Sequence, residues 1–241
     1  MPASSAVDRR PPPDRLLPSA RRQTGMALLV LAIGLFLLAF REIAEAVGAG
    51  GARAFDLAVY QALRPRASAE HSLAVAWARI AANDFSAMGS VSVLAFIVVM
   101  VCGLFLCLRR RAEAVVLLVA SGGGLALTNV LKDLFHQDRP PLTPEQMAGL
   151  NASFPSGHAM LSATVYLTLG ALIGHFAERR LIRLYALGVA ILLTAMIGLS
   201  RIWLGLHWTT DVLGGWCVGA AWALGWRAAV LCWRRFRERR R

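Results

Sequence analysis

Six long apolar segments constrain the fold of this 241-residue chain more than any other feature. A membrane-spanning helix needs roughly 20 mostly apolar residues, and each segment is close to that length. Hydrophobic residues make up 57% of the chain and charged residues only 17%, whereas soluble domains carry about a quarter charged residues. The sequence therefore predicts an all-α integral membrane protein, a bundle of six transmembrane helices in one domain. The segments cover about residues 24–46, 87–108, 113–132, 157–177, 181–200 and 210–233.

The net charge of +12 is distributed in a way that predicts the orientation of these helices. Arginine clusters precede the first segment, separate the second from the third and the fourth from the fifth, and end the chain. These are alternate connections, so they share one side of the membrane. The positive-inside rule places that side in the cytoplasm, together with both termini. Because topology accounts for the basic residues, we expect no nucleic-acid partner.

The remaining segments are predicted as follows. Residues 1–22, with Pro11-Pro12-Pro13 and scattered charges, are expected to be a disordered basic tail. Residues 23–233 form the membrane domain, and residues 234–241 form a basic cytoplasmic tail. We expect the first apolar segment to be retained as an anchor, with a cleaved signal peptide as the alternative.

The connection over residues 47–86 is the only long one between apolar segments. Leu73, Trp77 and Ile80 repeat at helical spacing there, which predicts amphipathic helices at the membrane interface. Two roles remain open for this connection. It could be a lid that guides lipid into a site, or a packed cap over the bundle.

Three polar clusters fall at segment ends, all on the side opposite the arginine clusters. Cations on that side run against the charge bias that sets topology, so a function is the better explanation for them. The clusters are Lys132 with Arg139-Pro140, Pro155-Ser156-Gly157-His158, and Ser200-Arg201 with His207 and Asp211.

Each cluster has residue types that suit a phosphate. Lysine acts as a point charge, and arginine can hold two phosphate oxygens at once. Ser156 and Gly157 open a predicted helix, whose free N–H groups and positive dipole end favour an anion. His207 and Asp211 are four residues apart, so the carboxylate can accept the Nδ1 proton and orient the imidazole.

These clusters resemble the signature of the type 2 phosphatidic acid phosphatase superfamily of membrane lipid phosphatases. That signature reads K-x6-RP, then PSGH, then SR-x5-H-x3-D. Every specified position matches in order and spacing, and the resemblance covers roughly residues 86–233. Six membrane spans are usual for the family, and the active site is then expected at the outer ends of the helices.

The resemblance implies a role for each position. His207 would attack phosphorus and become a phosphohistidine, and Asp211 would hold it. His158 would protonate the leaving oxygen and then activate water. No metal or other cofactor is expected. The phosphate would be bound by Lys132, Arg139, Ser156, Gly157 and Arg201.

The expected function is hydrolysis of a lipid phosphate or pyrophosphate at the periplasmic face of a bacterial inner membrane. Undecaprenyl pyrophosphate is the first candidate, because it is released on that side and must be recycled. Phosphatidylglycerol phosphate and phosphatidic acid are alternatives. The lipid substrate and the surrounding membrane lipids are the expected partners, and no obligate protein partner is evident.

Three other activities are compatible with parts of the pattern. The same site could transfer the phosphoryl group to a second lipid or sugar. Vanadate-dependent haloperoxidases share the motif set but are soluble, which the apolar segments oppose. A transporter is disfavoured, because transporter sites lie near the membrane midplane and these residues lie at segment ends.

Overall fold

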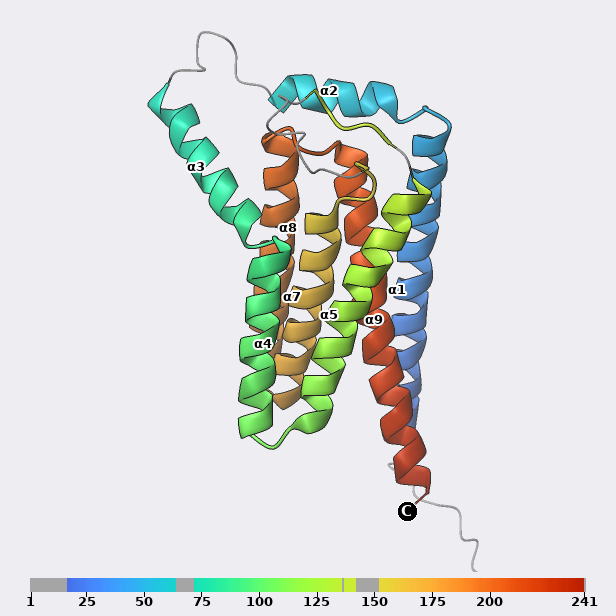
Figure 1. The fold of residues 1–241 in the computed structure, drawn as a ribbon. Helices are drawn as coiled ribbons and strands as arrows, with labels where there is room; N and C mark the ends of the chain where they lie inside the picture. Colours follow the sequence, from blue (N-terminus) through green and yellow to red (C-terminus); the bar gives the residue numbers. More distant parts are fainter. Residues whose placement is uncertain (1–16, 64–71, 136, 142–151, 241) are drawn as a thin grey trace, which may run out of the picture.

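The computed structural model describes residues 17–63, 72–135, 137–141 and 152–240. This part of the chain is helical and contains no strand (Figure 1). The expected all-helical class is therefore confirmed. Its helices are α1 (Leu17–Gly48), α2 (Arg53–Leu63), α3 (Leu73–Ala87), α4 (Val91–Cys107), α5 (Arg111–Leu134), α7 (Gly157–Phe176), α8 (Arg180–Trp203) and α9 (Thr209–Arg239).

Five of these helices are long and apolar enough to cross a membrane, namely α1, α5, α7, α8 and α9. The second predicted segment corresponds to α4, which has 17 residues. At 1.5 Å per residue α4 is about 26 Å long, short of the ~30 Å hydrocarbon core. It meets the requirement only together with α3, from which it is bent by 51°. A sixth span thus depends on this bent pair, which the apolar pattern alone did not indicate.

Both terminal helices extend beyond the expected membrane domain. α1 begins at Leu17, so residues 17–22 are helical where the sequence predicted part of a disordered tail. α9 continues to Arg239 through most of the predicted basic tail. Extending an existing helix costs little, and the arginine, glutamate and alanine residues of these two extensions are good helix formers. Residues 1–16 lie outside the described part of the chain.

α7 lies at the centre of the bundle and packs against α4, α5, α8 and α9. Glycines allow its closest approach to α9. A Cβ at Gly215 would meet the Ser156 carbonyl oxygen at 2.7 Å, and one at Gly219 would meet Ala163 Cβ at 2.7 Å. Small residues at this spacing let membrane helices pack closely. Gly215 and Gly219 thus let α9 pack directly against the backbone of α7.

The connections divide between the two ends of the bundle (Figure 1). The α8–α9 connection, α2, and the described residues between α5 and α7 (137–141 and 152–156) lie at one end. The arginine-rich α4–α5 connection and the C-terminus lie at the other. All three polar clusters of the sequence therefore meet at the same end of the bundle.

The two helices of the 47–86 connection have different environments. α2 lies over the start of α9, where Asp56 is 1% exposed and accepts hydrogen bonds from Thr210 N at 3.0 Å and Thr210 Oγ1 at 2.6 Å. Tyr60 packs on Trp208 with ring centroids 5.6 Å apart. α2 is thus a packed cap over the bundle.

The predicted apolar face of α3, in contrast, is not packed against protein. Leu73, Trp77 and Ile80 are 74%, 63% and 52% exposed. A helix with such a face is suited to contact with lipid. Of the two roles considered for the connection, the packed cap describes α2, and the lid stays a prediction for α3, whose apolar side points outward.

Asp56→Ala is expected to lower the Tm in detergent by about 5 °C, because two buried donors of Thr210 lose their acceptor. Burial raises the pKa of the Asp56 carboxyl, while the hydrogen bonds from Thr210 act in the opposite direction. A neutral residue that keeps an acceptor oxygen should therefore be tolerated, and Asp56→Asn is the matched control. Unchanged stability of the alanine variant would show that this contact does not anchor α2.

Candidate active site

His207 lies in the short connection between α8 and α9, and the start of α9 fixes its orientation. Gly205 makes the turn with φ +70°, a conformation that favours glycine. Asp211 Oδ2 accepts the backbone N–H of Trp208 at 2.9 Å, which caps α9. The same oxygen lies 3.2 Å from His207 Nδ1. One carboxylate therefore both starts the helix and holds the imidazole.

The other ring nitrogen of His207 faces a cation. Arg139 Nη1 lies 3.2 Å from Nε2, and the same nitrogen donates to the Leu206 carbonyl oxygen at 2.9 Å. With Asp211 accepting the Nδ1 proton, Nε2 is the nitrogen that carries the lone pair, and this lone pair faces Arg139. This is the arrangement that a nucleophilic imidazole needs.

The surroundings keep His207 in its neutral form. Its side chain is 2% exposed. Burial, and then the neighbouring cations led by Arg139 and Arg201, hold the pKa of His207 well below its ordinary value. Burial likewise lowers the pKa of Arg139, although a guanidinium remains charged at neutral pH. At pH 7 the site therefore combines a neutral imidazole with cations.

The start of α7 lies beside this histidine. Ser156 N donates to the Asp211 carbonyl oxygen at 2.9 Å, which ties the first turn of α7 to α9. Gly157 lies against Lys132, since a Cβ there would be 3.9 Å from Lys132 Nζ. The free N–H groups at this helix end thus lie close to the Lys132 ammonium, and together they can bind an anion.

Arg201 and His158 complete the cluster from α8 and α7. Arg201 is 8% exposed and its Nη1 donates to Ser86 Oγ at 2.7 Å. His158 is close enough to interact electrostatically with Arg201 and His207. Its ring packs against the α3–α4 junction, where a Cβ at Gly89 would lie 3.3 Å from His158 Cδ2.

The structure brings all the sequence-predicted site residues to one end of the bundle, from α5, the loop after it, α7, α8 and α9. Three of them bring buried polar atoms that have no hydrogen-bond partner within the described residues. These are Ser156 Oγ, Arg201 Nε and Asp211 Oδ1. Buried polar groups are normally paired, so such atoms fit a site that binds a polar ligand.

Ser153 is a site residue that sequence reasoning missed. It is fully buried, its hydroxyl donates a short hydrogen bond to Asp211 Oδ2, and it lies 3.4 Å from His207 Nδ1. The only sequence signal was its closeness to Pro155-Ser156-Gly157-His158. Ser86 and Gly89 were also missed, because they reach the site from the distant α3–α4 junction.

Ser153→Ala is expected to lower kcat about tenfold with little change in KM, because Asp211 loses a partner that orients it toward His207. Steady-state kinetics on a lipid phosphate measure both parameters. Ser162→Ala is the matched control, since Ser162 is equally buried but its hydroxyl donates to Ala159 O within its own helix. If the two variants had equal kcat and KM values, Ser153 would have no role in orienting Asp211.

The site thus places a neutral, carboxylate-held imidazole among cations at one end of an apolar helical bundle, an arrangement whose chemistry suits a phosphate. The chain matches the PAP2 superfamily over residues 113–239, more than half of its length. It therefore belongs to that superfamily, as the sequence motifs indicated.

Individual relatives agree with this assignment. The chain is 33% identical over 129 residues to phosphatidylglycerophosphatase B of Bacillus subtilis strain 168. That match covers 52% of this chain and 62% of the relative, less than two thirds of the relative's length.

Two solved structures share the fold. A transmembrane PAP2-type phosphatidylglycerolphosphate phosphatase from Bacillus subtilis superimposes with a TM-score of 0.71 at 24% identity, over 82% of this chain and 94% of the other. LpxE of Aquifex aeolicus gives a TM-score of 0.51 at 24% identity, over 71% and 93% of the two chains. The helical arrangement is therefore shared with a known transmembrane PAP2-type protein.

Proposed function

We propose that this protein is a metal-independent membrane lipid phosphatase that works through a phosphohistidine on His207. The observation that carries the proposal is the buried His207–Asp211 pair at 3.2 Å, with Nε2 directed at Arg139. Membership of the PAP2 superfamily and the name of the Bacillus subtilis relative support it.

In the first step, Nε2 of His207 attacks phosphorus and the bond to the leaving oxygen breaks. His158, which becomes protonated when the anionic phosphate binds beside it, gives that proton to the leaving oxygen. The Nδ1 proton of His207 stays on Nδ1, hydrogen-bonded to Asp211. Substrate replaces the Arg139–Nε2 contact with contacts between Arg139 and phosphate oxygens, which frees the lone pair for attack. The products are the released lipid alcohol, or lipid phosphate, and a phosphohistidine.

In the second step, water attacks the phosphohistidine from the side that the leaving group vacated. His158, now neutral, takes the proton of that water. The phosphorus–nitrogen bond breaks, its electron pair returns to Nε2, and inorganic phosphate leaves. His207 is thereby restored to its starting form.

The phosphate-binding groups supply the electrostatic part of the rate enhancement. Charge on a transferring phosphoryl group is spread over its three equatorial oxygens. Lys132, Arg139 and Arg201 would meet those oxygens, together with the N–H groups at Gly157 and the hydroxyl of Ser156. Fixed donors and cations in a water-poor site stabilise such charge strongly.

The candidate lipid substrates are ranked differently once the relatives are considered together with the sequence. The name of the relative makes phosphatidylglycerol phosphate the first candidate. Undecaprenyl pyrophosphate becomes the second, supported by the proposed periplasmic position of the site opposite the arginine clusters. Phosphatidic acid is the third. The exposed apolar face of α3 next to Ser86 and Arg201 offers a side from which a lipid can approach the site.

Phosphate release by the purified protein in detergent, with EDTA present, tests the proposal. The assay compares phosphatidylglycerol phosphate, undecaprenyl pyrophosphate and phosphatidic acid. We expect release that survives EDTA and follows the order given above. Loss of all release in EDTA, with recovery on adding a divalent cation, would overturn the metal-free mechanism. Phosphate found on an added lipid or sugar, with none released to water, would instead identify a transferase.

A further inference from the structure

A cavity of about 610 Å³ lies at the opposite end of the bundle from the candidate active site. It is bounded by the last turns of α7, the first turns of α8 and the second half of α9. Along α7, Thr168 and His175 of the cavity lie about 15 Å and about 26 Å from His158, at 1.5 Å per residue. The size is within the usual range of ligand sites, about 300–1,000 Å³.

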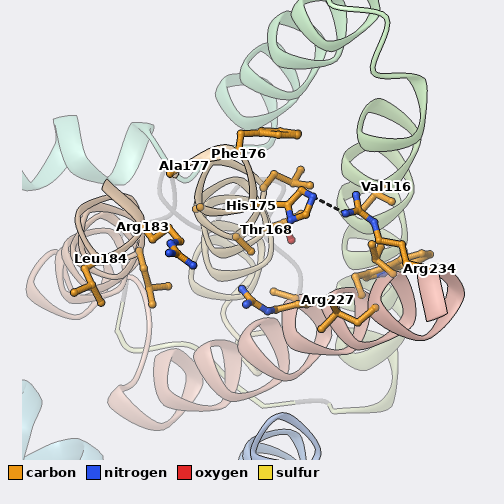
Figure 2. A pocket seen from close by; sticks show the side chains of 18 of the residues that line it. Val116, Thr168, His175, Phe176, Ala177, Arg183, Leu184, Arg227 and Arg234 are labelled. Atoms are coloured by element: carbon orange, nitrogen blue, oxygen red, sulfur yellow. Dashed lines mark hydrogen bonds between the residues drawn. The ribbon is translucent and has the colours of Figure 1, made fainter. Parts of the chain in front are cut away.

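The cavity gathers positive charge from α8 and α9, beside a histidine of α7 (Figure 2). His175 belongs to α7, Arg183 to α8, and Arg227 and Arg234 to α9, while Glu178 is the single carboxylate in the lining. Arg234 is already engaged, with Nη2 at 3.5 Å from Glu113 Oε1 and a hydrogen bond to His175. No ion pair with a carboxylate involves the other two arginines in the parts of the chain that the structure describes.

The remaining wall is apolar, with one polar exception. Leu172, Leu184 and Trp226 line it, and together they can hold hydrocarbon. Thr168 also lines the cavity, is 4% exposed, and its Oγ1 has no hydrogen-bond partner within the described residues. A buried hydroxyl without a partner is uncommon, so this group is suited to a ligand oxygen.

The cavity differs from the candidate active site in its chemistry. His175 contacts Arg234 and not a carboxylate, so nothing orients it as a nucleophile or base. The cations instead lie at the end of the bundle that carries the Arg109–Arg111 connection and the C-terminus. The positive-inside rule assigns that end to the cytoplasmic leaflet, which is rich in anionic lipid.

We propose that this cavity binds one anionic glycerophospholipid of the cytoplasmic leaflet. Arg183 and Arg227 hold the headgroup phosphate from two sides, and the Thr168 hydroxyl donates to a glycerol ester oxygen deeper in the membrane. The acyl chains lie along the apolar wall between α8 and α9. The lipid thereby links α7, α8 and α9 at the end far from the chemistry.

Thermal unfolding in a neutral detergent tests this proposal with dioleoylphosphatidylglycerol as the probe. Dioleoylphosphatidylcholine and inorganic phosphate are the comparison ligands. At a hundredfold excess over Kd we expect phosphatidylglycerol to raise the Tm by about 5 °C, and the other two to do so far less. An equal rise in Tm with inorganic phosphate would identify a site for small anions. An equal rise with phosphatidylcholine would show that the charge of the headgroup does not contribute to binding. Either result overturns the proposal.

The variant Arg183→Gln/Arg227→Gln should weaken phosphatidylglycerol binding at least about tenfold, because two charge-assisted contacts are lost. Arg179→Gln/Arg180→Gln is the matched control. It removes the same charge at the same end of the bundle, from residues that do not line the cavity. Equal weakening in both double variants would mean general attraction to a basic surface and would contradict a specific site.

A measurement on the unaltered protein covers the case in which the variant does not fold. A photoreactive phosphatidylglycerol is crosslinked, and the labelled peptides are identified by mass spectrometry. Label concentrated at the end of α7 and in α9 around Trp226 supports the site, whereas label spread evenly over the outer helix faces refutes it. Neither readout involves turnover, so the result is independent of the proposed phosphatase activity.

Discussion

His207→Ala is expected to reduce phosphate release by at least about a thousandfold, which corresponds to roughly 4 kcal/mol of transition-state stabilisation. The imidazole is the group proposed to form the bond to phosphorus, and an alanine offers no replacement. Because the buried ring contacts both Arg139 and Asp211, the variant also needs a folding check, for which thermal unfolding in the same detergent is sufficient.

Trapping the intermediate separates loss of chemistry from loss of structure. A lipid substrate labelled in its transferred phosphate should leave label on the wild-type protein after rapid quenching in alkali. A phosphorus–nitrogen bond survives alkali and is lost in acid, unlike a phosphoester on serine. The label should map to His207 and be absent from His207→Ala. Label on another residue, or turnover that survives in the alanine variant, would place the nucleophile elsewhere.

Asp211→Asn extends this test to the orienting group. The amide can still accept the N–H of Trp208 and cap α9, so the fold should be kept. It lacks the negative charge that supports the imidazole during attack, and it can favour the wrong tautomer. A loss of about 10⁴ in kcat follows a comparable change in serine proteases. We expect Asp211→Asn to lower kcat here as well, by a smaller factor than His207→Ala.

The second large effect is expected for His158→Ala, and it should depend on the leaving group. General acid catalysis typically contributes about 10²–10⁴ in rate, and it matters most for a basic leaving oxygen. An alkyl phosphate releases an alkoxide-like oxygen that needs the proton. A pyrophosphate releases a lipid phosphate, which leaves readily without one.

The measurement is kcat on both substrate types for the wild-type protein and for His158→Ala. We expect a loss of about 10³ on phosphatidylglycerol phosphate and a much smaller loss on undecaprenyl pyrophosphate, with KM nearly unchanged on both. Comparable losses on the two substrates would contradict the role of His158 as the acid. In that case its position against Gly89 would point to a structural role at the α3–α4 junction.

Membrane helices and the chemical residue types could be predicted because both depend on local pattern. Apolar length alone identified α1, α5, α7, α8 and α9 as spans, with ends within several residues of those observed. Helical spacing paired His207 with Asp211, since residues four apart share one face. The three motifs each lie in one short stretch, so their spacing was visible without any tertiary information.

The sequence by itself thus determined an apolar bundle, its superfamily, and the group of residues that could handle a phosphate. Only the tertiary structure decided what supports those residues. Ser153 against Asp211, Ser86 against Arg201, and Asp56 against Thr210 join positions that are 58, 115 and 154 residues apart. Hydropathy and helical periodicity describe neighbours along the chain, whereas a buried hydrogen bond across the bundle depends on which helix faces meet. For the same reason, the bend between α3 and α4 and the packing of α2 over α9 emerged only once the helices were assembled.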